Sequence, residues 1–476
     1  MRAGGRGRTI NRTKLICTIG PGSRDLIPEL VEAGMDIARI NFSHGEKRDH
    51  RQAFAAVRKA AESADRLIGI MADLSGPKIR LGTFDEGSIE LRVGSRFVLS
   101  SEPTLGDSSR ASTTYPELAR DLRQGDRILL ADGAAELSVT GTDTDVITEV
   151  IRGGVILSRA GVCVPSQRLT LRSITDRDRS DLRIITDLGF DFVAQSFVRS
   201  VEDVIELREL CQDSSIQLIA KIETGAAVED ADRILDTADG IMVARGDLGV
   251  ELPFSEIPVI QKSLLLKALS KGVPTIVATQ MLESMVSAPR PTRAEASDVA
   301  NAVLDGADAI MLSAETAIGS FPIEAAQAAV QIADNADRKG ILPWGDRRGR
   351  VPTSEDEAIA HAAGAVANSG AIVAIACFTV SGLSARLLSA VRPDVPILAL
   401  SPDAGVARQL SLRKSVRPRV CQEVRDTDSM IALLDDEIKK SGFVEQGGLV
   451  VMVGSTPIGS STTNFMKVHR VGTSGQ

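Results

Sequence analysis

The sequence has few aromatic residues and no excess of positive charge. Its 476 residues include one Trp, one Tyr and 12 Phe, and the net charge is -8. Few side chains could therefore stack on bases, and we expect no nucleic acid among its partners. The first 14 residues are basic but lack an apolar core, which excludes a secretory signal. We expect residues 1–12 to be a disordered, solvated tail rather than an RNA-binding or targeting arm.

Cysteine is sparse, and long apolar runs are absent. The five cysteines are scattered without a CxxC pair or zinc-type spacing, at Cys17, Cys163, Cys211, Cys377 and Cys421. Disulfide frameworks belong to small secreted chains, so these are expected to be reduced core thiols in a cytoplasmic protein. No run reaches the roughly 18 apolar residues of a membrane span. With 43% apolar and 25% charged residues, the chain is typical of a globular protein of about three domains.

Eight short runs read as strands, and most of them are apolar throughout rather than alternating, which indicates burial on both faces. They are Lys14–Thr18, Ile37–Phe42, Ile68–Leu74, Phe190–Phe197, Gln217–Ile222, Gly240–Ala244, Pro274–Thr279 and Ala309–Leu312. The segments between most of them have amphipathic helical patterns, and Thr292 to Glu295 fits a capping box. This order predicts an α/β fold built on a (β/α)8 TIM barrel.

Two further units are expected. Between the third and fourth runs, short strand patterns and Gly–Asp turns predict a small β-barrel lid at 78–171, inserted between barrel segments 13–77 and 172–340. A Gly-, Pro- and Arg-rich linker then leads to a helix opened by Ser354. Apolar strands separated by helices predict a C-terminal α/β regulatory domain at 354–476.

Polar and ionisable residues gather where the barrel strands should end, which is where reactive groups lie in this fold. They are Arg39, Asn41 and Ser43 after the second run, Asp73 after the third, Ser196 after the fourth, Lys221 and Glu223 at the fifth, Asp247 after the sixth, Thr279 after the seventh and Glu315 after the eighth. Any one alone would be an ion pair or a cap. Together they favour a metal-assisted phosphoryl-transfer site.

Several motifs occur in one order along almost the whole chain. They are Met35–Gly45, Asp73–Arg80, Leu218–Glu223, Ala244–Gly249, Ala278–Glu283, Pro291–Glu295 and Met311–Ala317. This set resembles the pyruvate kinase family, with one departure at Ala226, where the family has a polar or acidic residue. The resemblance implies a glycolytic phosphotransferase that converts phosphoenolpyruvate and ADP to pyruvate and ATP with Mg²⁺ or Mn²⁺.

The resemblance also implies roles for the strand-end residues. Glu223 and Asp247 would bind the metal, although a salt bridge to Lys221 or Arg245 is the alternative. Lys221 and Arg39 would hold the transferring phosphate, and Thr279 would help protonate the enolate. Substrate contacts are also expected from Ser196, Ala244, Arg245 and Gly246, together with Asp247.

For the nucleotide, the resemblance implies contacts from Arg80, Asn41 and His44, and from Asp132 in the lid. The lid contacts differ from the family pattern, because Ser158 to Ala160 stand where the family has a lysine. Members that do not need K⁺ carry a lysine at the position of Lys78, with leucine at that of Leu74. We therefore expect the Lys78 ammonium to replace K⁺, the alternative being that Asn41, Ser43 and Asp73 hold the ion.

The loop Thr379–Ser384 resembles the family's effector loop, which implies that Thr379, Ser381, Gly382 and Ser384 bind a phosphorylated metabolite. A helix cap is the alternative for that loop. The family also implies a homotetramer, with Arg293 near a subunit contact. Two other functions are open from the residues: a Mg²⁺-dependent lyase or aldolase acting on pyruvate enolate, and a ligand sensor without activity.

Overall fold

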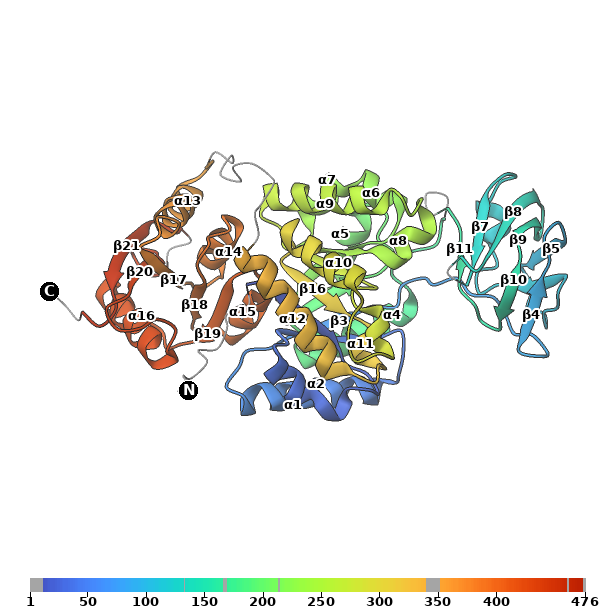
Figure 1. Ribbon diagram of the computed structural model, residues 1–476. Helices are drawn as coiled ribbons and strands as arrows, with labels where there is room; N and C mark the ends of the chain where they lie inside the picture. Colours follow the sequence, from blue (N-terminus) through green and yellow to red (C-terminus); the bar gives the residue numbers. More distant parts are fainter. Residues whose placement is uncertain are drawn as a thin grey trace.

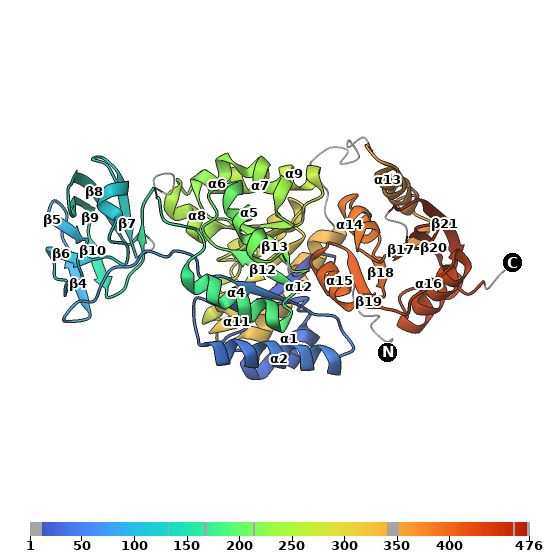
Figure 2. The same cartoon turned by 180° about the vertical axis from the view of Figure 1, so that it is seen from behind.

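The chain forms three units in a row. The computed structural model describes residues 12–131, 133–165, 169–212, 215–339, 352–459 and 462–473. A β-rich domain lies at one end, a barrel in the middle and an α/β domain at the other end (Figures 1 and 2). The predicted fold class is confirmed.

Eight parallel strands close the central barrel in the order β1-β16-β15-β14-β13-β12-β3-β2. Each of the eight apolar runs contains one of them: β1 Lys14–Thr18, β2 Ile37–Asn41, β3 Gly69–Asp73, β12 Phe192–Gln195, β13 Gln217–Ile222, β14 Gly240–Ala244, β15 Thr275–Ala278 and β16 Ala309–Leu312. Their inward side chains fill the barrel, and Leu412 of the C-terminal domain is fully buried in the same cluster. After β3 the chain leaves the barrel and enters the inserted domain, at the end of the barrel opposite to Leu412.

Helices surround the barrel and bury their apolar faces on its outside. They are α1 Ile27–Ala33, α2 Lys47–Ser63, α4 Asp176–Leu188, α5 Val201–Leu210, α6 Gly225–Glu229, α7 Ala231–Thr237, α8 Arg245–Glu251, α9 Ile257–Lys271, α10 Arg293–Leu304, α11 Ala314–Ala317 and α12 Pro322–Lys339, with 3-10 turns η1 Arg24–Leu26 and η3 Glu283–Val286. The predicted capping box at Thr292 opens α10, and further capping boxes open α2, α4 and α5.

The inserted domain lies between β3 and α4 and has its own apolar core. A six-stranded sheet, ordered β11-β7-β8-β9-β5-β6, curls beside the pair β10-β4. The elements are β4 Ser88–Leu91, β5 Arg96–Ser100, β6 Arg110–Ser112, α3 Leu118–Asp121, β7 Arg127–Leu130, β8 Ala135–Thr142, β9 Val146–Arg152, β10 Gly154–Leu157 and β11 Val162–Cys163.

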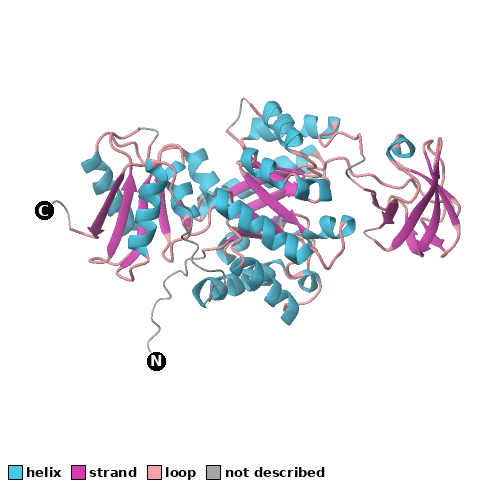
Figure 3. Ribbon diagram, turned by 90° about the horizontal axis from the view of Figure 1, so that it is seen from above, coloured by secondary structure: helices cyan, strands magenta, loops and turns pink. Residues whose placement is uncertain are grey.

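The C-terminal domain is a five-stranded sheet, ordered β19-β18-β17-β20-β21, with helices packed on it (Figure 3). Ser354 caps its first helix, as predicted. The elements are α13 Glu355–Ala367, β17 Ile372–Phe378, α14 Leu383–Ala390, β18 Ile397–Ser401, α15 Ala404–Gln409, η5 Leu410–Leu412, β19 Val416–Val420, α16 Thr427–Ser441, β20 Leu449–Gly454 and β21 Phe465–Arg470. Among the described residues, no helix is long and apolar enough to cross a membrane.

Buried ion pairs join the C-terminal domain to the amino-terminal end of the barrel. The Arg392 guanidinium donates to both carboxylate oxygens of Asp308, each at 2.7 Å. Lys414 Nζ lies 2.8 Å from Asp337 Oδ1 in α12. Because acidic barrel residues meet basic residues of the partner domain, the interface occupies this end of the barrel and leaves the carboxyl ends of the strands for a site.

Candidate active site

Side chains from neighbouring strands meet around the ammonium of Lys221 on β13. Its Nζ lies 2.7 Å from Glu223 Oε1 and 3.2 Å from Asp73 Oδ1, and it donates to Ser196 Oγ at 2.7 Å. The Ser196 hydroxyl in turn donates to the carbonyl of Leu74 at 2.8 Å. The strand-end residues of β3, β12 and β13 therefore form one connected polar network, as their positions at adjacent strand ends predicted.

Arg39 on β2 extends this network on the other side of Asp73. Its Nε donates to Asp73 Oδ2 at 2.7 Å, and its Nη1 donates to Thr18 Oγ1 at 2.9 Å. Asp73 is buried between the cations Arg39 and Lys221, and its negative charge holds both side chains in place. Thr18 ends β1, the one strand for which the sequence offered no candidate, although its place at a strand end was a signal that could have found it.

Electrostatics hold Lys221 in its charged form. Burial alone would lower the pKa of Lys221, but Asp73 and Glu223 outweigh burial and raise the pKa above its usual value. Burial likewise opposes ionisation of Asp73, yet Lys221 and Arg39 hold the pKa of that carboxyl below its usual range. Lys221 is therefore a fixed positive charge rather than a proton acceptor.

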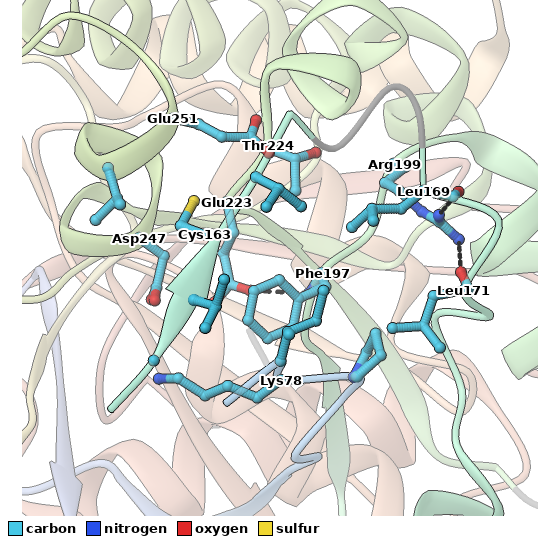
Figure 4. Close-up of a pocket in the computed structure, with 16 residues that line it drawn as sticks. Lys78, Cys163, Leu169, Leu171, Phe197, Arg199, Glu223, Thr224, Asp247 and Glu251 are labelled. Carbon is cyan, nitrogen blue, oxygen red and sulfur yellow. Dashed lines mark hydrogen bonds between the residues drawn. The ribbon is translucent and has the colours of Figure 1, made fainter. Parts of the chain in front are cut away.

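Glu223 and Asp247 line one cavity beneath the inserted domain (Figure 4). Glu223 Oε2 accepts the N–H of Phe197 at 2.8 Å, with Phe197 held at φ 55°. Burial, with the nearby charge of Asp247, raises the pKa of Glu223 even though Lys221 opposes the shift. The alternative salt bridge from Lys221 to Glu223 is thus present. Oε1 of Glu223 contacts the Lys221 ammonium, and Oε2 accepts the Phe197 N–H. Sequence reasoning did not single out Phe197.

Two carboxylates on one cavity wall suit a hard divalent cation, which prefers oxygen ligands. Among the residues that the structure describes, no cluster of three or more His, Cys, Asp or Glu side chains forms a ready-made metal cage. A cation held by Glu223 and Asp247 would therefore take its other ligands from substrate and water.

Thr279 lies beside the start of α8 in a strained turn. Thr279 and Gln280 have φ values of 69° and 54°, in the left-handed region. A β-branched residue such as Thr279 rarely adopts this conformation. The Thr279 hydroxyl accepts the N–H of Gly246 at 2.8 Å and donates to the carbonyl of Ala278 at 2.6 Å. Arg245 supports the turn, because it donates to the Thr279 carbonyl at 2.8 Å and lies 2.7 Å from Asp298. Ala244 is the N-cap residue of α8.

Two of the predicted nucleotide residues, Asn41 and His44, lie at and just after the end of β2. The side-chain oxygen of Asn41 accepts the N–H of Ser43 at 3.0 Å. Burial lowers the pKa of His44, and so do the nearby cations Arg80, Lys78, Arg39 and Arg177. This local positive field suits a polyphosphate. The backbone of Arg80 forms an antiparallel β-bridge with Gly161 of the inserted domain. Asp132 lies outside the described residues.

The loop Thr379–Ser384, predicted to bind an effector, has both buried and exposed positions. Thr379 and Ser384 are buried, and the Ser384 hydroxyl is 2.7 Å from that of Thr463. Gly382, at φ 82°, is the N-cap residue of α14. Ser381 is exposed at the surface.

The sequence matches the family model "Pyruvate kinase, barrel domain" over residues 10–326 and "Pyruvate kinase, alpha/beta domain" over residues 357–469. The chain belongs to the pyruvate kinase family. It is 43% identical to a pyruvate kinase of Geobacillus stearothermophilus over 471 residues, covering 96% of this chain and 80% of the relative. For a Corynebacterium efficiens pyruvate kinase, identity is 41% over 467 residues, covering 97% and 98%.

A crystal structure of a pyruvate kinase from Cryptosporidium parvum superposes with a TM-score of 0.92 at 34% identity, covering 97% of each chain. Pyruvate kinases are phosphotransferases, so this chain is an enzyme of that class. The family does not favour the lyase or aldolase alternative.

Proposed function

We propose that this enzyme transfers the phosphoryl group of phosphoenolpyruvate to ADP at the carboxyl ends of the barrel strands, in a Mg²⁺-dependent reaction. The observation that carries the proposal is the buried, positively charged Lys221, which lies between Asp73 and Glu223 and beside the cavity that Glu223 shares with Asp247. A fixed cation and carboxylates for a divalent ion are what a transferring phosphoryl group requires.

In this mechanism, Arg39 and Lys221 bind the phosphate oxygens, and Lys221 offsets the charge that develops as the phosphorus moves. The bond from phosphorus to the enol oxygen breaks, and a bond to an oxygen of the ADP β-phosphate forms. The resulting enolate takes a proton at its terminal carbon from the side of Thr279, with water. A divalent cation bound to Glu223 and Asp247 would neutralise substrate oxygens.

The direct test is a coupled assay of pyruvate formation with and without ADP. We expect pyruvate to form only when phosphoenolpyruvate, ADP and a divalent cation are all present. Pyruvate formed at the same rate without ADP would instead support a lyase or phosphatase activity, and no pyruvate under any condition would support a sensor.

Glu223→Gln and Asp247→Asn are each expected to raise the Mg²⁺ concentration for half-maximal activity by about tenfold or more, because each removes a charged oxygen ligand. Titrating Mg²⁺ and Mn²⁺ at fixed substrate concentrations measures the shift. Glu251→Gln is the matched control, since Glu251 lines the same cavity but its carboxylate accepts the Gly225 N–H. Overlaying titrations for the parent and both ligand variants would remove these residues as ligands.

Activity is expected not to require K⁺, because the Lys78 ammonium supplies a fixed monovalent charge near the substrate phosphate. Lys78 lies within the field of cations around His44, which supports this assignment. The assay is run in tetramethylammonium buffer at constant ionic strength, with and without K⁺. Activation by more than about tenfold would correspond to about 1.4 kcal/mol that Lys78 does not supply, and would contradict the proposal.

We also propose a cytoplasmic homotetramer that responds to a phosphorylated metabolite through Thr379–Ser384. Ser381→Ala is expected to weaken activation by sugar phosphates or nucleoside monophosphates without changing the rate at saturating substrate, because this exposed hydroxyl is free to meet solvent-borne ligands. Substrate half-saturation measured with a panel of such compounds tests this. A parent enzyme that responds to none of them would count against an effector site.

A further inference from the structure

A single buried carboxylate holds both connections between the barrel and the inserted domain. Asp178, in the first turn of α4, is 1% exposed. Its Oδ1 accepts the N–H groups of Ser75 and Gly76, at 3.1 and 3.3 Å, where the chain leaves the barrel. Its Oδ2 accepts the N–H and the hydroxyl of Thr175, at 2.9 and 2.6 Å, where the chain returns. Each oxygen therefore binds one connection.

The surroundings make this point a firm pivot. Gly76 has φ 63°, and a Cβ atom added there would lie 2.9 Å from the Phe197 ring. On the returning side, the Arg199 guanidinium donates to the carbonyls of Leu169 and Leu171, at 2.5 and 2.6 Å (Figure 4). Both connections are thus fixed to the barrel directly below the inserted domain, whereas the domain itself lies apart from the barrel (Figure 1).

The same pivot is linked to both halves of the proposed reaction. Leu74, next to Ser75, accepts the Ser196 hydroxyl that also binds Lys221. On the nucleotide side, the backbone of Arg80 forms an antiparallel β-bridge with Gly161, and its guanidinium donates to the Arg159 carbonyl at 3.2 Å. Arg80 should therefore move with the inserted domain. The angle of the inserted domain therefore sets where Arg80 lies, while the phosphoenolpyruvate residues stay on the barrel.

We propose that Asp178 is a positioning residue, which fixes the pivot about which the inserted domain closes over bound nucleotide. The inference rests on the proposed function. Asn at this position has one acceptor and one donor group, so one of the two connections would face a donor and lose its hydrogen bonds. The inserted domain would then sample orientations in which Arg80 is misplaced.

Asp178→Asn in the full-length enzyme with Mg²⁺ is expected to raise the KM for ADP and lower kcat, so that kcat/KM for ADP falls by about tenfold or more. Half-saturation for phosphoenolpyruvate should change less than about threefold, because its contacts lie on the barrel. Hydrogen exchange of the backbone amides in residues 74–79 should be faster in the variant, which reads the pivot without using activity.

Asp176→Asn is the matched control: Asp176 is an exposed acid in the same first turn of α4, so its loss has the same effect on the helix dipole. It should leave both kinetics and exchange unchanged. Should Asp178→Asn not fold, Thr175→Val removes the hydroxyl that donates to the same carboxylate and accepts the Asp178 N–H, and it should move kcat/KM for ADP in the same direction by about threefold.

Two results would overturn the inference. One is an Asp178→Asn enzyme with the ADP kinetics and exchange of Asp176→Asn. The other is a loss of activity in proportion to the unfolded fraction, with the KM for ADP unchanged. A parent enzyme that makes no pyruvate from phosphoenolpyruvate and ADP would instead refute the proposed function, and the exchange experiment would still report on the pivot.

Discussion

Lys221→Met is expected to lower kcat by about 10³ or more, with a much smaller change in the half-saturation for phosphoenolpyruvate. The charge of Lys221 lies in a buried network in which Asp73 and Glu223 hold it protonated. In such surroundings a fixed charge stabilises developing charge far better than water does. Steady-state kinetics at saturating Mg²⁺ and ADP measure both quantities.

A structural loss must be separated from this catalytic loss, because Lys221→Met also leaves Asp73 and Glu223 with fewer partners. Lys262→Met is the control, since Lys262 makes an ion pair with the buried Asp305 on the outside of the barrel. Thermal unfolding of both variants reports the structural cost, and only Lys221→Met should lose turnover in its folded fraction. Retention of more than about a tenth of parental kcat would contradict the role of Lys221.

Asp308→Asn is expected to destabilise the contact between the barrel and the C-terminal domain by about 3–5 kcal/mol, because it removes the negative charge that balances a buried guanidinium. Asp308 is 2% exposed, and its carboxylate accepts two hydrogen bonds from Arg392, one from the Lys414 N–H and one from the Thr275 N–H of the barrel. Urea unfolding followed by circular dichroism should show the first transition at a lower urea concentration.

The control for this variant is an exposed ion pair between the segment just before β1 and the C-terminal domain. Arg12 lies 3.8 Å from Asp394, whose side chain is 74% exposed. Because an exposed pair contributes about 0–1 kcal/mol, Asp394→Asn should shift the transition little. Equal shifts for the two variants would show that burial of the Asp308 pair adds nothing.

The effect of Asp308→Asn should also depend on pH. Burial opposes ionisation of Asp308, but Arg392 outweighs it and holds the pKa below the usual value. A depressed folded-state pKa gives stability that is fully present above the unfolded pKa of about 3.9 and is lost as pH falls through the folded value. The difference between parent and variant should therefore be full at neutral pH and shrink below about pH 4. A difference that grows on acidification would contradict this assignment.

The barrel could be predicted from sequence because its strands are buried on both faces, so most of them appear as continuous apolar runs. Edge strands were harder. β19 reads Val416-Arg417-Pro418-Arg419-Val420, and a proline among arginines does not look like a strand. It is tolerated because β19 pairs with β18 alone and lies at the edge of its sheet.

The site could be predicted only as far as strand ends determine it. Lys221, Glu223 and Asp73 end strands that the sequence places, and their convergence follows from the barrel. The pairing of Arg39 with Asp73, the bond from Phe197 to Glu223 and the two-sided contacts of Asp178 depend on distant segments meeting. For Asp178, the sequence signal was local. Thr175 followed by an acid three residues later indicates a helix cap, but it does not indicate that Asp178 also binds the connection at Ser75 and Gly76.

Phosphorus NMR of the parent enzyme, incubated with phosphoenolpyruvate, ADP and Mg²⁺, tests the central claim most directly. We expect the phosphoenolpyruvate resonance to decrease as the γ-phosphate resonance of ATP grows in equal amount, and Lys221→Met to show neither change on the same timescale. Appearance of inorganic phosphate in place of ATP, or equal ATP formation by the Lys221→Met enzyme, would contradict phosphoryl transfer at this site.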